Sequence, residues 1–169
     1  VGEQNLSMGL IVMDREELIA MVKDASVQNR MYLERDILGP SLKTLRVQGY
    51  EYTGYRARIY DVKSYFDENM RLLCPENMAA LFPSERPVYT KVRDEAPVRY
   101  AMDSKVHRCV VADGCIIEGE IENCIIFRGV KISKGAVVKN CVLMQGTVVE
   151  PGVSMEYIVT DKNVIVTMG

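Results

Sequence analysis

Few side chains in this sequence could carry acid, base or nucleophile chemistry. His107 is the only histidine, which excludes a three-histidine metal site within one chain. One histidine can still serve as a general base toward a hydroxyl or an amine, so acyl transfer with His107 as the base stays open. His107 stands where a sequence repeat begins, and this position favours an exposed residue without a catalytic role.

The five cysteines form an odd set without a C-x-x-C pair, which argues against both a disulfide framework and a zinc site. Cys109, Cys124 and Cys141 occupy equivalent positions of the repeat. A small, soft side chain at such a position packs on the next repeat, so we predict packing roles and no redox or nucleophilic role. Cys115, which follows Gly114, is predicted to be a small corner residue.

Motifs for phosphate loops, dinucleotide binding and serine hydrolysis are absent, since there is no G-x-x-x-x-G-K-[ST], G-x-G-x-x-G or G-x-S-x-G. A net charge of -2 without a basic run argues against nucleic acid as a partner. No apolar stretch approaches the roughly 20 residues that span a membrane. Reduced thiols fit a reducing compartment. We therefore expect a cytoplasmic protein that binds neither nucleic acid nor membrane.

The first half of the chain mixes helix and strand patterns. Asp14, followed three residues later by Glu17, matches a capping box that opens a helix. The stretch 50–62 is rich in aromatic and β-branched residues, which favour strands. The expected elements are a strand at 9–13, a helix from Asp14 through Lys23, a helix at 40–45, strands at 50–55 and 57–62, and a helix from Ser64 with Phe66, Met70 and Leu73 on one face.

A cluster of prolines divides the chain. Four of the six prolines fall between Cys74 and Val98, as expected for a linker or an extended surface crossing. We therefore predict a first domain at 1–74, a proline-rich linker at 75–104 and a second domain at 105–169.

The last third of the chain repeats itself. Triplets at 109–111, 124–126, 141–143 and 157–159 recur at spacings of 15, 17 and 16 residues. A finer period of six predicts two columns, one of Ile126, Ile132, Val138 and Met144, the other of Val130, Ala136, Val142, Val148 and Ser154. Six residues are three steps of the strand period of two, so every sixth side chain returns to the same face. The pattern predicts a parallel β-helix of about four coils, the last one frayed.

Glycines mark the expected corners of this coil, because a residue without Cβ turns tightly at little steric cost. The corner glycines are Gly114, Gly129, Gly135, Gly146 and Gly152. The phase of the repeat slips between Ile121 and Cys124 and again near Glu150, so we predict corner loops of varying length.

Three segments carry the signatures of one enzyme family. The stretch 7–12 is similar to a strand reading S-M-G-I-Y-V, 64–70 to a helix reading S-Y-Y-x-A-N-M, and 160–164 to a β-helix ending in I-D-K-N. These motifs resemble the bacterial glucose-1-phosphate adenylyltransferases, also called ADP-glucose pyrophosphorylases, over nearly the whole chain. The resemblance implies an α+β remnant of a Rossmann-like nucleotidyltransferase domain, followed by a left-handed parallel β-helix of hexapeptide repeats. It also implies a C-terminal fragment, with the family's G-G-x-G-T-R-L phosphate loop upstream of Val1.

The resemblance further implies a vestigial sugar-phosphate site. The residues that fall on it are Ser7, Gly9, Asp36, Arg56 and Arg58. The stretch 32–36 lacks the first acid of the family's D-F-G-x-D, and Arg58 stands where the family's G-Y-W-R-D-V-G-T has an aspartate that helps to hold the metal. A guanidinium cannot coordinate Mg²⁺. We therefore predict no catalytic residue, metal ligand or cofactor in this chain, and Mg²⁺ only in the full catalytic assembly.

Two alternatives stay open at this site. Arg56 and Arg58 could bind phosphate directly, since the guanidinium fork suits phosphate geometry. A shift of the alignment by a few residues would instead place Asp61 in the role of the missing carboxylate.

The resemblance implies a regulatory or weakly catalytic subunit of the enzyme that makes ADP-glucose and pyrophosphate from ATP and glucose 1-phosphate for glycogen biosynthesis. The β-helix is then an assembly or regulatory module. Lys162 matches a lysine implicated in activator binding, and Lys162 and Arg128 are predicted to bind a phosphorylated small-molecule effector. The expected partner is the catalytic subunit, in a hetero-oligomer expected to be a tetramer, or a second copy of the chain. A hexapeptide-repeat acyltransferase using His107 and another sugar-nucleotide pyrophosphorylase stay open as functions.

Overall fold

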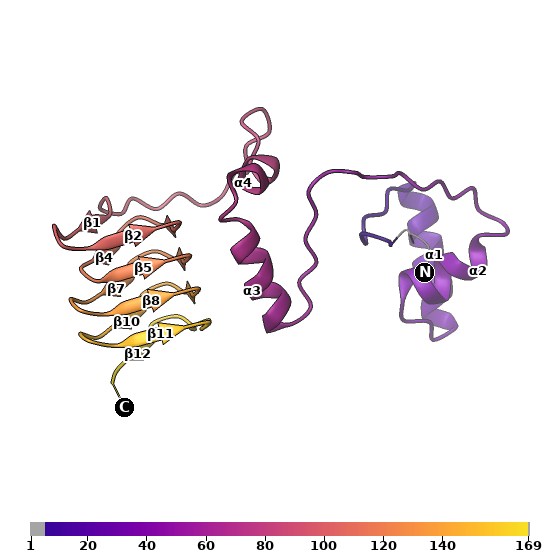
Figure 1. Cartoon of the computed structure of the whole chain (residues 1–169). Helices are drawn as coiled ribbons and strands as arrows, with labels where there is room; N and C mark the ends of the chain where they lie inside the picture. The colour runs from indigo at the N-terminus through magenta and orange to yellow at the C-terminus, as the bar shows by residue number, and fades with distance from the viewer. Residues whose placement is uncertain (1–5, 169) are drawn as a thin grey trace, which may run out of the picture. The chain divides into compact units, whose positions relative to one another are not determined.

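The computed structural model describes residues 6–168, and the chain divides into two compact units (Figure 1). We call Val1–Tyr52 the N-terminal unit and Thr53–Gly169 the C-terminal unit, and describe each by itself. This division falls elsewhere than the proline cluster, and the domain ranges 1–74, 75–104 and 105–169 stay a prediction. Among the described residues, no helix combines the length and the apolar composition that crossing a membrane requires.

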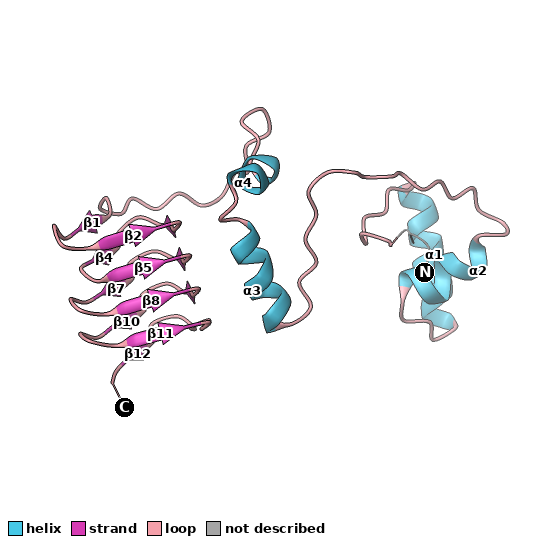
Figure 2. Cartoon of the chain, viewed as in Figure 1, coloured by secondary structure: helices cyan, strands magenta, loops and turns pink. Residues whose placement is uncertain are grey.

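The N-terminal unit consists of helices joined by loops (Figure 2). Helix α1, Arg15–Val27, begins as predicted at Asp14, whose carboxylate accepts hydrogen bonds from the backbone N–H of Glu16 (2.8 Å) and Glu17 (3.2 Å). Helix α1 continues four residues past the predicted end at Lys23. A π-helix at Leu33–Leu38 and the short helix α2, Gly39–Ser41, precede turns in place of the helix predicted at 40–45.

The strands predicted in the first half are wrong. Residues 9–13, 50–55 and 57–61 are loops in the structure, and Val62 begins a helix. A strand needs a neighbour to accept and donate its backbone hydrogen bonds, and none of the described strands lies before Arg99. The side chains of Leu10, Ile11 and Val12 are correspondingly exposed, with Val12 fully so.

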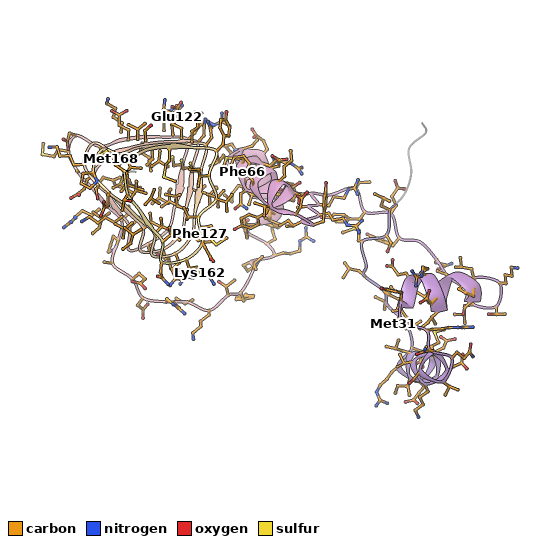
Figure 3. The ribbon with its side chains drawn as sticks, turned by 90° about the horizontal axis from the view of Figure 1, so that it is seen from below. Met31, Phe66, Glu122, Phe127, Lys162 and Met168 are labelled. Atoms are coloured by element: carbon orange, nitrogen blue, oxygen red, sulfur yellow. The ribbon has the colours of Figure 1, made fainter. Side chains whose placement is uncertain are left out.

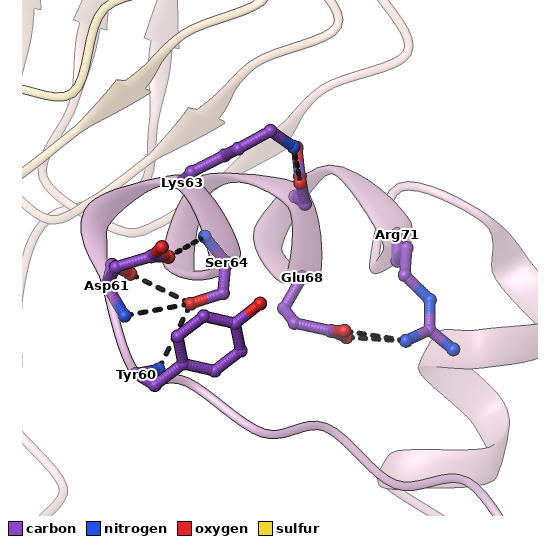
Figure 4. Close-up of polar contacts among 7 residues, drawn as sticks. Tyr60, Asp61, Lys63, Ser64, Glu68 and Arg71 are labelled. Carbon is purple, nitrogen blue, oxygen red and sulfur yellow. Dashed lines mark hydrogen bonds and ion pairs between the residues drawn. The ribbon is translucent and has the colours of Figure 1, made fainter.

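Helix α3, Val62–Arg71, begins two residues before the predicted Ser64 because Asp61 supplies its cap (Figure 4). The Asp61 carboxylate accepts from the Ser64 backbone N–H at 2.6 Å, and the Ser64 hydroxyl oxygen accepts from the Asp61 N–H at 3.0 Å. This reciprocal pair is a capping box. A further helix, α4 at Pro75–Leu81, opens with a proline and occupies part of the predicted linker.

The rest of the C-terminal unit is the predicted parallel β-helix. Its strands are β1 (Arg99–Tyr100), β2 (Lys105–His107), β3 (Val110–Val111), β4 (Ile116–Ile117), β5 (Glu120–Glu122), β6 (Ile125–Ile126), β7 (Lys131–Ile132), β8 (Val137–Lys139), β9 (Val142–Leu143), β10 (Val148–Val149), β11 (Ser154–Glu156) and β12 (Ile165–Val166). They form three parallel sheets, ordered β1-β4-β7-β10-β12, β2-β5-β8-β11 and β3-β6-β9. The three sheets are the faces of a triangular coil, seen along its axis in Figure 3.

Coils of two lengths are stacked in register. Lys105 pairs with Glu120, 15 residues on, whereas Asn123 lies against Asn140, 17 residues on. One coil is short because its connection from β4 to β5 consists only of residues 118–119. The corresponding connection in the next coil, from β7 to β8, consists of residues 133–136. This confirms the prediction of corner loops that vary in length.

The interior of the coil is apolar and closely packed. The predicted columns hold as far as Val138, since Ile126, Ile132 and Val138 are buried. Beyond Asn140 the phase moves by one residue, so Leu143 points inward in place of the predicted Met144. The second slip therefore lies at Asn140, and the prediction of a slip near Glu150 was wrong. The cause is local, because Asn140 takes a left-handed conformation (φ 49°) at a corner where the inward positions, Val138 and Leu143, are five residues apart in place of six.

One corner of the coil carries a ladder of polar side chains. Arg108, Asn123, Asn140 and Tyr157 occupy it in successive coils, all with positive φ. Asn123 Nδ2 donates to Asn140 Oδ1 at 3.2 Å, and Asn140 Nδ2 donates to Glu156 Oε1 at 2.8 Å. Asn123 Oδ1 is buried without a partner. The ladder therefore lacks a donor from the preceding coil, where Arg108 stands.

Arg108→Asn is expected to stabilise the β-helix by about 1 kcal/mol. An asparagine tolerates positive φ better than an arginine, and its Nδ2 can donate to the orphaned Asn123 Oδ1. The urea midpoint of unfolding, followed by far-ultraviolet circular dichroism, measures the gain. Arg108→Ala is the control, because it removes the same side chain without supplying a donor. An equal gain from both variants would show that the donor is irrelevant.

Helix α3 covers the outer face of the sheet β3-β6-β9. Ile125 and Val142 alternate with inward residues and lie outside the interior cluster, yet both are buried, Val142 completely. The ring of Phe66 on α3 lies 6.3 Å from the ring of Tyr157 at the adjoining corner, at an angle of 57° (Figure 3). The amphipathic face predicted for this helix therefore packs against the β-helix.

The two units differ in how much apolar surface they bury. Ala25 and Ile37 are the buried apolar residues among the described part of the N-terminal unit, where Leu10, Val12 and Val27 are largely exposed. The β-helix instead encloses a continuous cluster of buried side chains. Local stability follows the apolar area buried, so we expect the N-terminal unit to open far more readily than the coil.

Limited proteolysis with subtilisin is expected to cut within residues 6–52 at least about 100-fold faster than within 105–166, because cleavage follows the population of opened chain. Mass spectrometry of the fragments over time gives both rates. Early cuts inside the coil, at a rate comparable with those in 6–52, would contradict the expectation.

Candidate functional site

The candidate effector residues share one corner of the β-helix. Gly129, Gly146 and Asn163 occupy this corner in successive coils with positive φ. Their backbone N–H groups donate to the carbonyls of the coil before, as Gly146 N does to Arg128 O at 3.0 Å and Asn163 N does to Gln145 O at 2.8 Å. The stacking places Lys162 directly two coils below Arg128, a separation of about 10 Å at the usual spacing of strands.

Buried threonines fix the backbone that carries Lys162. Thr147 Oγ1 lies 2.9 Å from Thr160 Oγ1 and donates to the carbonyl oxygens of Met144 (2.7 Å) and Asp161 (3.2 Å). Thr160 Oγ1 also accepts from the backbone N–H of Met144 at 3.0 Å. Thr147 and Thr160 were missed by the sequence reasoning, although their polar side chains at inward positions of the repeat could have indicated such a network.

The corner carries cations that are available to a ligand. The side chain of Lys162 is exposed and that of Arg128 is half-buried, and neither donates a side-chain hydrogen bond within the described part of the chain. Phe127, also partly exposed, lies near the same corner (Figure 3). Two free cations about 10 Å apart can pair with separate anionic groups of one small molecule.

In the N-terminal unit, Ser7 and Gly9 meet the segment that contains Glu34. The Ser7 hydroxyl donates to Glu34 Oε1 at 2.7 Å and accepts from the Gly9 N–H at 3.1 Å. A shallow hollow lies here, lined by Gly9, Ile11, Met31, Tyr32, Leu33, Glu34 and Arg35. Ser7 and Gly9 are therefore near the stretch 32–36 with which the sequence associates them.

Asp36 serves the local fold. Its carboxylate accepts from the backbone N–H groups of Met31 (3.2 Å) and Tyr32 (3.1 Å) and pairs with Arg35 at 2.6 Å. The hydrogen bond from Arg35, followed by that from Tyr32, lowers the pKa of Asp36 to about 2. This carboxylate is thus an ionised cap at the start of the π-helix.

Arg56 and Arg58 belong to the C-terminal unit, whereas Ser7, Gly9 and Asp36 belong to the N-terminal unit. Arg56 and Arg58 lie in an exposed loop that is tied to α3 through Tyr55, whose hydroxyl donates to Glu68 at 3.2 Å. The Arg71 guanidinium, which pairs with Glu68, lies 5.0 Å from the centre of the Tyr55 ring. Burial, and then the bond to Glu68, raises the pKa of Tyr55.

The residues present do not fit a Mg²⁺ site. Within the described residues, no group of three or more His, Cys, Asp or Glu side chains could hold a metal ion. The Asp61 carboxylate, the alternative ligand, is engaged as the cap of α3, and the guanidinium of Arg58 has no acceptor atom. The expectation of Mg²⁺ in a full catalytic assembly stays a prediction.

The histidine and the cysteines occupy different environments. His107 ends strand β2 on an open outer face and is exposed. Cys124 and Cys141 are fully buried inside the coil, where their thiols donate to the carbonyls of Glu122 (3.1 Å) and Lys139 (2.9 Å) respectively. The neighbouring thiols and burial raise the pKa of Cys124, which keeps it a thiol. The predicted packing role of these cysteines is confirmed.

Comparison with known proteins finds one matching family and two groups of relatives. A family described as "GlmU-like, C-terminal hexapeptide" matches residues 94–169. The glycogen biosynthesis protein GlgD of Bacillus subtilis is 48% identical over 120 residues, which cover 71% of this chain and 35% of that protein. The GlgD protein of Geobacillus stearothermophilus is 49% identical over 70 residues, 41% of this chain and 20% of that protein.

A second group of relatives carries an enzyme name. The glucose-1-phosphate adenylyltransferase of Geobacillus stearothermophilus is 36% identical over 90 residues, covering 53% of this chain and 23% of the enzyme. The chain thus spans about a third or less of the length of these relatives. The resemblance that the sequence predicted is confirmed.

Proposed function

We propose, from its homology to the GlgD proteins and the glucose-1-phosphate adenylyltransferases, that this chain is part of a regulatory, non-catalytic subunit acting in glycogen biosynthesis. The subunit assembles with a catalytic adenylyltransferase subunit, in an assembly proposed to be a tetramer in the cytoplasm. The catalytic partner makes ADP-glucose and pyrophosphate from ATP and glucose 1-phosphate.

One observation carries the non-catalytic part of the proposal. In the resemblance to the adenylyltransferases, Arg58 of the stretch 54–61 falls where that family has a metal-ligating aspartate, and Asp61, the nearest acid in the sequence, is held as the N-cap of α3. A cation at this place repels Mg²⁺, and Asp61 would have to leave the helix to replace the missing ligand. The greater identity to GlgD than to the named enzyme supports the same reading.

The regulatory part of the proposal rests on the corner of Arg128 and Lys162. A phosphorylated effector binds there, with Lys162 and Arg128 each pairing with an anionic group. Because this corner is built of stacked backbone hydrogen bonds, an effector that bridges two coils stiffens the end of the β-helix. The proposed consequence is a change in the activity of the catalytic partner.

The full-length protein that contains this chain tests the proposal, purified alone and together with an adenylyltransferase homologue from the same organism. Pyrophosphate-dependent ATP formation from ADP-glucose is expected to be negligible for the protein alone and changed in the mixture. Robust activity of the protein alone would overturn the non-catalytic assignment. Other sugar nucleotides assayed in parallel test whether a different pyrophosphorylase reaction fits better.

Lys162→Gln is expected to weaken the response of the mixture to its effector about tenfold, because it removes a charge-assisted hydrogen bond. A panel of sugar phosphates and inorganic phosphate serves as probe, and the concentration for half-maximal response is measured. Lys134→Gln is the matched control, since Lys134 pairs with Asp103 at another place on the coil. Equal responses of the two variants would remove Lys162 from the site.

A further inference from the structure

In the described part of the C-terminal unit, the outer face of the sheet β2-β5-β8-β11 is open, and most of its outward side chains are exposed. In β5, β8 and β11 the middle residue is buried inside the coil and the first and third point outward, and β2 is paired with β5 in the same register. Lys105, His107, Lys139, Ser154 and Glu156 on this face are exposed, and a shallow hollow runs along it. In Figure 3, Glu122 projects from this face, away from both α3 and the corner of Lys162.

The outward side chains form two rows along the coil axis. The in-register pairing of the strands sets His107, Glu122, Lys139 and Glu156 in one row. The other row is Lys105, Glu120, Val137 and Ser154. Within the first row, Glu122 pairs with Lys139 at 3.1 Å, and in the second, Lys105 pairs with Glu120 at 2.5 Å.

When two copies of this face meet with their coils in opposite directions, opposite charges in the first row lie across from each other. From coil to coil the first row presents a histidine, an acid, a base and an acid. Consider a second copy turned by 180° about an axis parallel to the strands. Its coils run in the opposite direction, and each of its two rows lies opposite the same row of the first copy. Glu122 then faces the Lys139 of the other copy, and His107 faces the Glu156.

The second row is compatible with this arrangement. It brings Lys105 opposite the Ser154 of the other copy and Glu120 opposite the Val137, so no like charges meet. If the two coils ran in the same direction, the rows would exchange places and Glu122 would face Glu120 of the other copy. Like charges would then meet, so the charges select the antiparallel arrangement.

We propose that this face binds a second copy of the same chain, with antiparallel coils related by a two-fold axis between β5 and β8. The surface is independent of the proposed function and of the Lys162 corner, so either can fail alone. Four short strands make a small face, and stable interfaces bury about 800 Å² per partner, so the dimer is weak and salt-dependent.

The decisive experiment mixes two charge variants of the full chain, Glu122→Lys and Lys139→Glu, in analytical ultracentrifugation at low salt. Each variant alone brings like charges together twice across the two-fold axis, and its self-association is expected to fall about tenfold below that of the wild type. The equimolar mixture places both lysines of one variant opposite both glutamates of the other. It is expected to form a heterodimer at least as strong as the wild-type dimer.

The mixture separates this contact from pairing within one chain. Each single variant breaks the internal Glu122–Lys139 pair, and mixing cannot restore a bond inside a chain. Thermal unfolding of each variant checks that it folds, and the neutral variants Glu122→Gln and Lys139→Gln serve if a charge reversal does not. Lys131→Glu, on the sheet that contains β7, is the matched control and is expected to leave the dimer unchanged.

Three results would overturn the proposal. The first is a wild-type chain that stays monomeric at low salt and high concentration. The second is a mixture that behaves as the sum of its components. The third is stronger self-association of Glu122→Lys alone, which would indicate parallel coils with Glu122 near Glu120.

Discussion

Gly119→Ala is expected to destabilise the β-helix by about 3 kcal/mol. A Cβ at this position would lie 2.4 Å from the carbonyl oxygen of Ala136 and 2.9 Å from that of Ser133. Both atoms belong to the backbone of the next coil, whose position the hydrogen bonds of the sheets hold, so neither can move away cheaply. Gly119 forms half of the two-residue connection that makes this coil short. The substitution should therefore disturb the stacking of two coils.

Urea unfolding monitored by circular dichroism measures this effect, with two glycine controls. Gly129→Ala meets no atom within 4 Å but has φ +66°, so it should cost only the strain of a left-handed residue, about 1 kcal/mol. Gly49→Ala meets nothing and needs no unusual φ, and should cost little. A loss for Gly119→Ala no greater than that for Gly129→Ala would show that the coils can separate locally.

Leu143→Ala is expected to cost about 3 kcal/mol, because it leaves a cavity in the centre of the coil. Leu143 is fully buried and belongs to the interior cluster, between the coil of Ile126 and that of Thr160. Each side chain of the cluster is fixed by backbone in register above and below, which limits the collapse that could fill the space. The full destabilisation should therefore appear.

The free energy of unfolding from urea titration again gives the magnitude, and Ile165→Ala provides the comparison. Ile165 lies on an outer face and is 65% exposed, so the loss of its side chain should cost less than about 1 kcal/mol. Comparable costs for the two variants would mean that the interior is loosely packed.

The β-helix was predictable because its signal is repetitive and local. A period of six with glycines at the corners specifies inward and outward positions without knowledge of any distant contact. The error at Asn140 is instructive, since an asparagine can take the left-handed conformation of a corner as a glycine does. Counting asparagine together with glycine would have located the second slip.

The strands predicted in the first half failed because strand propensity does not supply a partner. Residues 50–55 have suitable side chains, but a strand forms only where a neighbour accepts its backbone hydrogen bonds. The predictions of helices α1 and α3 were correct because the first turn of each helix is capped by the residue directly before it, Asp14 or Asp61.

At the candidate site, too, the sequence identified single residues, and the structure was needed to show which of them lie together. The motif at 160–164 singled out Lys162, but the alignment of Lys162 with Arg128 depends on the lengths of the coils between them. The role of Asp61 as a helix cap, which removes it as a substitute metal ligand, also became visible only with α3 in place.

By itself, the sequence determined the β-helix, its corners, the packing role of the cysteine column and the family resemblance, because each follows from residue types at short, regular spacings. Only the tertiary structure decided which side chains share a row or a corner. Those positions depend on register between coils, and register is set by the number of residues in each connection and by left-handed corners such as Asn123 and Asn140. The charge order from His107 to Glu156 has meaning only once that register is known.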